Sequence, residues 1–530
     1  MNNTTGRSRP ALPHPNRRGF LLGSMGALVG TGIIAAPGAI AQAASGTDTL
    51  YVGMARDFAT FDPAVAVTST NIATNLLVFE RLYETSFADR QTRPMLALGD
   101  PERVSDTLYR VAYRTDSVFH TGRSVTGDDV VFSINRLVDE ENSYFYRQFI
   151  PFIKEARLIE EGLIELELTY PTDILKDRLA VVGIVPKELV EADPEAFGAA
   201  PVGSGPFRFV SAAANDRVVL ERFNEYIGET PGLVNSIELR IIMDSSSRAI
   251  ALTTGEVSLI EEPSDLDLLN LEASPEIETA FRPGFLASFI MFNCSKAPFD
   301  DKRVRQALMY AIDREELVDV ALFGNGNVAK ALIPEHHPSY REPETVYTYD
   351  PERARSLLAE AGYPEGLVLD GRQLMAQVFT TVWNEAAANL IISKWRDIGI
   401  DFSQNVGGEA IYSNVVDGSY DVLIALTDQS YFGWDGPLLY GWFHGPFWSE
   451  QLNHFEGEAA ERLHELLTES LRAGVDRPAI LAEMQSIILE EMPMSILFHR
   501  AVPTAWRPDE IEGVAPLETA SLDVRLVAKK

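Results

Sequence analysis

Cysteine is almost absent from this sequence of 530 residues, because the one example is Cys294 in the apolar run FLASFIMFNCS. A single thiol excludes an intramolecular disulfide and a zinc cluster built from cysteines. The predicted cleavage site described below also has no cysteine that could carry a lipid. We expect Cys294 to be a small buried residue in a strand, and we expect the chain to have no lipid anchor.

Positive charge is also scarce. The chain has 45 lysines and arginines against 77 aspartates and glutamates, which gives a formal net charge of −32. So acidic a surface disfavours nucleic acid and anionic lipid as partners and favours solubility. Hydrophobic residues make up 46% of the sequence, which indicates a globular protein, and its length favours two or three lobes over a single core.

Motifs that carry catalysis are missing. No Gly-Lys-Ser or Gly-Lys-Thr occurs, so the phosphate-binding loop of ATPases is excluded. The turn VGSGPF at residues 202–207 fails the Gly-x-Ser-x-Gly spacing of a hydrolase nucleophile. The histidines lack the spacing, with an intervening glutamate, that builds a hydrolytic zinc site. We therefore expect a protein that is not an enzyme and has no cofactor.

One long stretch near the N-terminus, from Gly19 to Thr47, has no charged residue. Residues 16–45, NRRGFLLGSMGALVGTGIIAAPGAIAQAAS, begin with two arginines and continue as an apolar run diluted by glycine and proline. Ala41-Gln42-Ala43 is the small-x-small pattern that a signal peptidase reads, so residues 1–43 are interpreted as a signal peptide cut after Ala43. Arg17-Arg18 resembles the twin-arginine export motif, with ordinary secretion as the alternative. Both routes predict a periplasmic protein.

Strand-like and helix-like patterns alternate through the rest of the chain, and no second apolar stretch reaches membrane length. This alternation favours a mixed α/β fold. Residues 237–260, IELRIIMDSSSRAIALTTGEVSLI, form a clear unit in which a strand ends at Asp244, a short helix follows, and Gly255 precedes a second strand.

Capping patterns predict three further helices. Thr126 with Asp129 is a capping box in front of GDDVVFSINRLVD. Asp350 followed by Pro351 begins a helix that ends at Gly362. The segment at 301–324, DKRVRQALMYAIDREELVDVALFG, carries one apolar stripe after Asp300 and is predicted as a single helix that Gly324 ends.

Several phrases occur in an order that is similar to one known family. They are FDPA, LLVFERLYE, RPMLALGDPERVSDTLYRVAYRTDSVFHTGRSVTGDDVVFSINRL, PVGSGPFRFV, MDSSSRAIALTTGEVSLI, APFDDKRVRQALMYAIDREELV and YDPERARSLLAEAGYPEG. Together they resemble the extracellular solute-binding protein family 5. Members of that family are periplasmic receptors of peptide, nickel and related ABC importers.

The resemblance implies a two-lobed clamp of α/β fold with an extra subdomain inserted in the first lobe. The first lobe is expected at 44–88, 203–292 and 503–530, the subdomain at 89–202 and the second lobe at 293–502. Hinges are expected near Asn293 and near Arg500. The implied partners are ABC permease subunits in the inner membrane, and the receptor itself is expected to be a monomer.

The resemblance also points to a ligand-binding segment at residues 427–450, TDQSYFGWDGPLLYGWFHGPFWSE. In similar peptide receptors, an aspartate four residues before a proline, in the pattern Asp-aromatic-x-acid-Pro, pairs with the amino terminus of the peptide. Aligned on Pro437, that position is Gly433 here, and aspartates stand only at 428 and 435. We expect Asp435 to face the ligand through a shifted loop, with Asp428 as the alternative.

The same segment is rich in aromatic residues, which can stack on sugars or on apolar side chains, or can form a core cluster under a loop. Val67 and Ser69, after FDPA, are also expected to face the ligand, and Asn293 adds a hinge position. The candidate ligand-binding residues are Asp435, Trp434, Tyr431, Phe432, Trp442, Val67, Ser69 and Asn293.

The predicted function is capture of a small solute between two closing lobes, with a short peptide or an amino-acid-derived compound as the expected ligand. A receptor for an oligosaccharide or glycoside is the first alternative. A metal-chelate receptor is the second, and it would require His336 and His337 in the cleft. No metal ligand is assigned on the sequence.

Replacing Arg17 and Arg18 by lysine tests the export route. If the paired arginines are read by the twin-arginine machinery, the variant precursor should accumulate in the cytoplasm. Fractionation and N-terminal sequencing measure this, and wild-type protein should begin at Ala44. A normal periplasmic yield of the variant would favour ordinary secretion.

Overall fold

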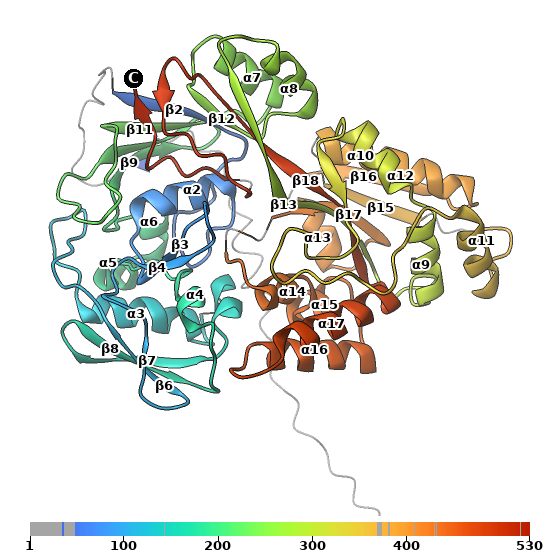
Figure 1. The fold of residues 1–530 in the computed structure, drawn as a ribbon, viewed down its shortest axis with the longest axis horizontal. Coiled ribbons are helices and arrows are strands. Elements are labelled where there is room, and N and C mark those ends of the chain that lie inside the picture. The colour runs from blue at the N-terminus through green and yellow to red at the C-terminus, as the bar shows by residue number, and fades with distance from the viewer. Residues whose placement is uncertain are drawn as a thin grey trace, which may run out of the picture.

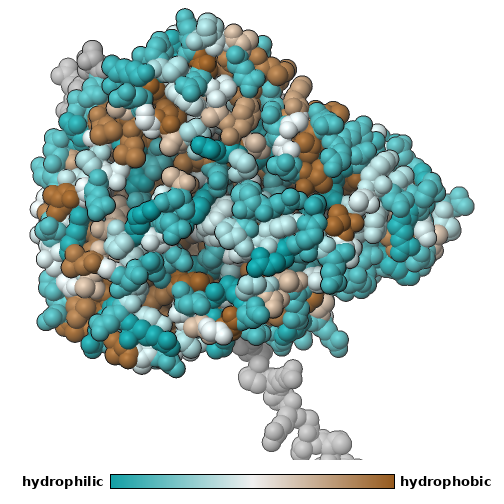
Figure 2. All heavy atoms as spheres, viewed as in Figure 1, coloured by the Kyte–Doolittle hydropathy of each residue, from teal (hydrophilic) through white to brown (hydrophobic). Residues whose placement is uncertain are grey.

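The computed structural model describes residues 34–35 and 48–530, except 143, 368–373, 380–381, 409, 429, 431 and 520. Most of the predicted signal peptide therefore lies outside the described residues. The described chain forms two halves with a smaller subdomain below the first (Figure 1). Hydrophilic residues cover most of the face seen in Figure 2, as the net charge of −32 leads one to expect. None of the helices within the described ranges is long and apolar enough to cross a membrane.

One twelve-stranded sheet runs through both halves, in the order β1-β9-β10-β11-β2-β12-β18-β13-β17-β15-β16, with β14 paired to β18. In the first half β11, β2 and β12 are parallel neighbours, and in the second half β16, β15 and β17 are parallel neighbours. Parallel strands need crossover connections, so helices join them in both halves.

The first half contains the following strands and helices: β1 (Ile34–Ala35), β2 (Thr49–Met54), α2 (Ser69–Val78), β3 (Tyr83–Thr85), β4 (Thr92–Pro94), β9 (Phe207–Ala213), β10 (Arg217–Arg222), β11 (Ser236–Ile241), α7 (Ser245–Thr253), β12 (Leu259–Glu261), α8 (Asp265–Glu272), β19 (Ile511–Glu512) and β20 (Ala528–Lys529).

The small subdomain is an antiparallel sheet, β5-β6-β8-β7, covered by helices. Its elements are β5 (Glu102–Arg103), β6 (Leu108–Ala112), α3 (Gly127–Val138), the 3-10 helix η1 (Phe145–Phe149), β7 (Ile153–Glu160), β8 (Leu163–Leu168), α4 (Leu175–Leu179), α5 (Lys187–Ala192) and α6 (Pro194–Ala199).

The second half carries most of the helices: α9 (Lys302–Tyr310), α10 (Arg314–Ala321), β14 (Gly326–Val328), α11 (Pro351–Glu360), β15 (Leu374–Phe379), α12 (Val382–Asp397), β16 (Phe402–Gly407), α13 (Ala410–Val416), β17 (Val422–Thr427), α14 (Gly436–His444), α15 (Pro446–Gln451), α16 (Glu458–Ser470) and α17 (Arg477–Glu491).

Two long strands, β13 (Glu278–Phe292) and β18 (Met494–Trp506), join the halves and run diagonally between them in Figure 1. They pair with each other from Glu278 opposite Trp506 to Met291 opposite Met494, and the register shifts between Pro283 and Leu286. Only the part of β13 after this shift also pairs with β17. β13 therefore already pairs with β17, a strand of the second half, before the chain reaches Asn293, where a hinge is expected. The lobe boundaries stay predictions.

Local patterns predicted most of the tested helices correctly. The strand-helix-strand unit is β11, α7 and β12, with Asp244 as the cap that accepts from Ser247 N at 2.7 Å. The helix that begins with Pro351 is α11, and its cap is Asp350.

The single helix predicted at 301–324 was wrong, because the chain forms α9 and α10 there. Asp313 interrupts the segment, since its side chain accepts a hydrogen bond from Glu316 N at 3.1 Å and so caps a new helix. The first cap is Asp301 rather than Asp300. Cys294 is another correction: it is partly exposed and follows β13 rather than lying within it.

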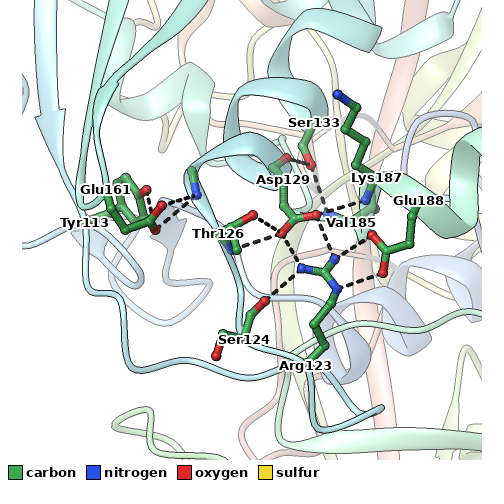
Figure 3. A network of polar contacts seen from close by, with 11 residues as sticks. Tyr113, Arg123, Ser124, Thr126, Asp129, Ser133, Glu161, Val185, Lys187 and Glu188 are labelled. Carbon is green, nitrogen blue, oxygen red and sulfur yellow. Dashed lines mark hydrogen bonds and ion pairs between the residues drawn. The ribbon is translucent and has the colours of Figure 1, made fainter.

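The predicted capping box of α3 is confirmed and extends into a larger network (Figure 3). Asp129 accepts hydrogen bonds from Thr126 N at 2.9 Å and from both terminal nitrogens of Arg123 at 2.8 Å. Arg123 also contacts Glu188 at 2.7 Å, and Lys187 N donates to Asp129 at 3.0 Å. The network ties α3 to α5 and makes the subdomain a rigid support.

Gly284→Ala tests the crossing of β13 and β18. A Cβ at this position would lie 2.4 Å from Val502 Cγ2 and 2.8 Å from the Glu518 carbonyl oxygen, so a strand has to shift. We expect a loss of about 1–3 kcal/mol in the free energy of unfolding, measured by denaturant titration. Gly99→Ala is the matched control, because its Cβ would meet nothing within 4 Å. Equal stability of both variants would contradict tight packing at the crossing.

Candidate functional site

A cavity of about 60 Å³ lies where the first half, the small subdomain and the second half meet. Its walls combine apolar and polar side chains from all three parts. The lining residues are Pro63, Ile72, Asn75, Leu76, Arg81, Glu84, Thr85, Phe87, Tyr146, Ala180, Val181, Ser430, Phe432 and Gly433. This volume is well below that of ordinary small-molecule sites, about 300–1,000 Å³, so a solute can enter only if the surrounding parts move apart.

Helix α2 forms one wall of the cavity. Thr68 caps the helix by accepting from Asn71 N at 3.3 Å, as a hydroxyl residue at this position typically does. Ile72, Asn75 and Leu76 then fall on one face, because residues three and four apart are neighbours on a helix. The chain continues through Arg81 into β3, which brings Glu84 and Thr85 to the same cavity.

The loop between β17 and α14 forms the opposite wall, through Ser430, Phe432 and Gly433. Asp428 accepts hydrogen bonds from the Ser430 backbone at 2.9 Å and from the Ser430 hydroxyl at 2.6 Å, so it shapes this loop. Asp428 is buried, and it does not line the cavity.

Asp435 was expected to meet a ligand amine, but in the structure its carboxylate faces the small subdomain. Arg178 of α4 donates to both oxygens of Asp435, at 2.8 and 2.9 Å, in a bidentate ion pair. Asp435 also caps α14 by accepting from Leu438 N at 3.0 Å. The side chains are 2% and 15% exposed. The negative charge of Asp435 is therefore already compensated within the chain.

An aromatic stack continues this contact between the subdomain and the second half. Phe432 packs face to face with Phe149 at 5.1 Å and with Trp442 at 5.3 Å between ring centres, and Tyr146 meets Phe432 edge-on at 5.5 Å. Among the predicted ligand residues that the structure describes, Phe432 is the one that also lines the cavity, and Trp442 stacks on it.

The Trp434 ring packs against other side chains of the protein. The Arg90 guanidinium lies 4.0 Å from its ring centre, and the His337 ring lies at 4.5 Å. Phe285 meets it edge-on at 5.9 Å. Trp434 is not among the residues that line the cavity, and its contact with a ligand stays a prediction.

Val67 and Ser69 lie at the start of α2, outside the cavity lining. Val67 is 44% exposed. The Ser69 hydroxyl donates to Glu261 at 2.9 Å, and Ala55 N donates to the same oxygen at 2.7 Å. Burial raises the pKa of Glu261 to about 7, with the neighbouring Glu262 adding to the shift.

Asn293 has a structural position, because it is 1% exposed and its amide donates to the Tyr420 carbonyl at 3.2 Å within the second half. Tyr431 lies outside the described residues, so no contact can be assigned to it.

One histidine of the pair that a metal-chelate receptor would use, His337, is already hydrogen-bonded within the protein. His337 Nδ1 accepts from Ser339 N at 2.9 Å, and Nε2 contacts the Trp434 carbonyl at 2.9 Å. Burial lowers the pKa of His337 to about 4, which keeps the ring neutral. In the part of the chain that the structure describes, no group of three or more His, Cys, Asp or Glu residues is arranged to hold a metal ion.

Sequence reasoning did not identify Asn75, Arg81 or Arg178. Arg81 belongs to the phrase LLVFERLYE and Arg178 to a short helix, and neither has a spacing pattern that marks a binding residue. The feature of the sequence that could have marked Arg81 and Arg178 is a charged residue that stands among apolar ones. Whether Arg81 or Arg178 forms an ion pair depends on residues that are far away in the sequence.

Comparisons with known proteins give a consistent result. The family model "Bacterial extracellular solute-binding proteins, family 5 Middle" matches residues 91–450. Heme-binding protein A of Haemophilus influenzae is 30% identical over 371 residues, which cover 64% of this chain and 66% of that protein.

Solved structures resemble the whole described fold. A dipeptide binding protein from Pseudoalteromonas sp. SM9913 in complex with Met-Leu has a TM-score of 0.81 at 21% identity, covering 91% of this chain and 100% of that one. The PBP AgaA in complex with agropinic acid, from A. tumefaciens R10, has a TM-score of 0.80 at 23% identity, covering 91% and 99%. The fold class predicted from the sequence is thereby confirmed.

Asp435→Ala tests the ion pair with Arg178. Removing the carboxylate leaves the Arg178 charge buried and unpaired, so the ligand-free protein should lose about 3–5 kcal/mol in its free energy of unfolding. Glu465→Ala is the control, because its pair with Arg462 is exposed and should contribute less than about 1 kcal/mol. Denaturant titration measures both. An unchanged stability of Asp435→Ala would show that Asp435 is free of Arg178 in solution.

Proposed function

The chain belongs to the bacterial extracellular solute-binding proteins of family 5, and we propose that it is the receptor of an ABC importer that captures one small solute between its two halves. The observation that carries this proposal is the cavity, since its lining comes from the first half, the small subdomain and the second half together. A solute bound there contacts all three parts and is enclosed when they approach each other.

Contacts between the subdomain and the second half support a clamp that closes. Besides Arg178 and Asp435, the Thr172 hydroxyl donates to the Leu471 carbonyl at 2.6 Å, and Arg477 pairs with Asp173 at 2.5 Å. A ligand that touches both sides binds the closed arrangement more tightly than the open one, and so shifts the population toward closure.

We propose a short peptide or an amino-acid-derived compound as the solute. The cavity supports this class, because apolar walls such as Ile72 and Phe432 alternate with polar groups such as Arg81 and Ser430. Similar structures hold Met-Leu and agropinic acid, which are compounds of this kind.

The alternatives receive less support. A sugar receptor needs an aromatic face that is free to stack, and the Phe432 ring already stacks with Phe149 and Trp442. A chelate receptor built on His336 and His337 would have to break both hydrogen bonds of His337.

The proposal includes export to the periplasm and delivery to permease subunits in the inner membrane. The uncharged segment after Arg17 and Arg18 supports export, and the family description names extracellular proteins. The energy for import is then supplied by separate subunits.

A thermal-shift screen of dipeptides, opines and oligosaccharides tests the ligand class. A true ligand at 100 times its Kd stabilises the protein by about 2.7 kcal/mol, which raises the melting temperature. We expect hits among dipeptides or opines, and a smaller radius of gyration by solution scattering when the hit is added. Hits confined to oligosaccharides would reject the proposed class.

A variant that fills the cavity locates the binding site. Ala180 lines the cavity, whereas Ala192 is exposed at the end of α5. Ala180→Trp should abolish the thermal shift caused by the hit, and Ala192→Trp should preserve it. Retained binding by Ala180→Trp would place the solute elsewhere.

A further inference from the structure

Two charged side chains, Arg81 and Glu84, line the cavity, and one of them is already neutralised. Glu84 pairs with Arg525 at 2.5 Å, and Arg525 also pairs with Asp523 at 2.6 Å. The carboxylates nearest to Arg81 are thus held by another arginine.

Arg81 is fixed in place by its backbone. Its N–H donates to the Met95 sulfur at 3.4 Å, and its carbonyl accepts from Leu96 N at 3.0 Å. It also forms an isolated bridge with Gly183. The backbone that carries the guanidinium is therefore held at the cavity wall by hydrogen bonds, which helps to position a specific binding group.

Among the described residues the guanidinium has no hydrogen-bonded or ion-paired partner, although Glu84 and Asp523 lie near enough to attract its charge. Within the described residues, no group forms a hydrogen bond to Arg81 Nη1, which is buried, and no carboxylate forms an ion pair with this side chain. Burial lowers the pKa of Arg81, because the charged form loses water. A buried guanidinium that makes no hydrogen bond and no ion pair is costly, so Arg81 is a group that a solute could pair with.

A second unsatisfied group belongs to the same cavity. Asn75 is 3% exposed, and no hydrogen bond reaches its side-chain oxygen from the described residues. This oxygen is an acceptor, so it is complementary to an N–H group. The loop on the opposite wall adds no charge to the cavity, because it contributes Ser430, Phe432 and Gly433.

We infer that Arg81 receives a carboxylate of the solute and that Asn75 accepts an N–H close to it. The inference rests on the proposed function and narrows it to N-substituted amino acids, a class that includes peptide carboxyl termini and opines. The planar guanidinium fork matches a carboxylate in a bidentate pair. Recognition is then anchored on the acidic end of the solute, while the nearby Asp435 stays with Arg178.

Calorimetry with paired probes tests this assignment. The probes are Met-Leu and a panel of other dipeptides, each as the free acid and as the C-terminal amide. We expect the free acid of a binding dipeptide to bind at least about 30-fold more tightly than its amide, since the amide leaves Arg81 unpaired. Arg81→Gln should lower the affinity for the acid by a similar factor and leave that for the amide nearly unchanged.

Two control variants separate recognition from structure. Arg103→Gln removes an arginine that is 54% exposed and pairs with Asp106, and it should leave binding unchanged. Arg81→Lys keeps a positive charge and should restore part of the affinity that Arg81→Gln loses. Ligand-free Arg81→Gln should melt no lower than wild type, because the desolvation of the buried charge outweighs its attraction to Glu84 and Asp523 and no hydrogen bond is lost.

The outcomes distinguish this inference from the proposed function. If acid and amide bind equally, or if Arg81→Gln binds the acid like wild type, the inference fails while the receptor function stands. A lowered melting temperature of ligand-free Arg81→Gln would assign the arginine a structural role and also overturn it. If no dipeptide and no opine binds wild type, the proposed ligand class fails and the inference fails with it.

Discussion

The antiparallel pairing of β13 with β18 is the constraint on which the rest of the structure depends. Both strands belong to one sheet that continues into each half, so the halves share a continuous hydrogen-bonded connection. The cavity exists because this connection holds the loop after β17 opposite α2. The register of this pair shifts between Pro283 and Leu286 and again between Ser288 and Phe289, which interrupts the ladder of hydrogen bonds locally.

Two arginines show how the same side chain acquires different roles from its surroundings. Arg178 is 2% exposed and finds both oxygens of Asp435, so it joins the subdomain to the second half. Arg81 lies at the cavity wall without such a partner. A paired buried charge supports the structure, whereas an unpaired one is a candidate for binding an opposite charge.

Elements with local signals could be predicted from the sequence. Thr126 with Asp129 and Asp350 with Pro351 mark helix starts whose hydrogen bonds form within one turn of the chain. The segment 301–324 misled prediction, because its apolar stripe continues past Asp313, while the side chain of Asp313 forms a cap that ends that continuity. A stripe indicates which residues are buried, and a cap decides where the helix begins.

The sequence by itself determined the α/β class and the likeness to a solute-binding family, and it singled out the segment 427–450, because order and periodicity are properties of the chain. Only the tertiary structure decided which residues of that segment meet the cavity. Phe432 and Gly433 line it, and Asp435 turns toward Arg178, whose position is 257 residues away along the chain. Charge pairing depends on distance in space, and no local pattern encodes the distance between residues so far apart.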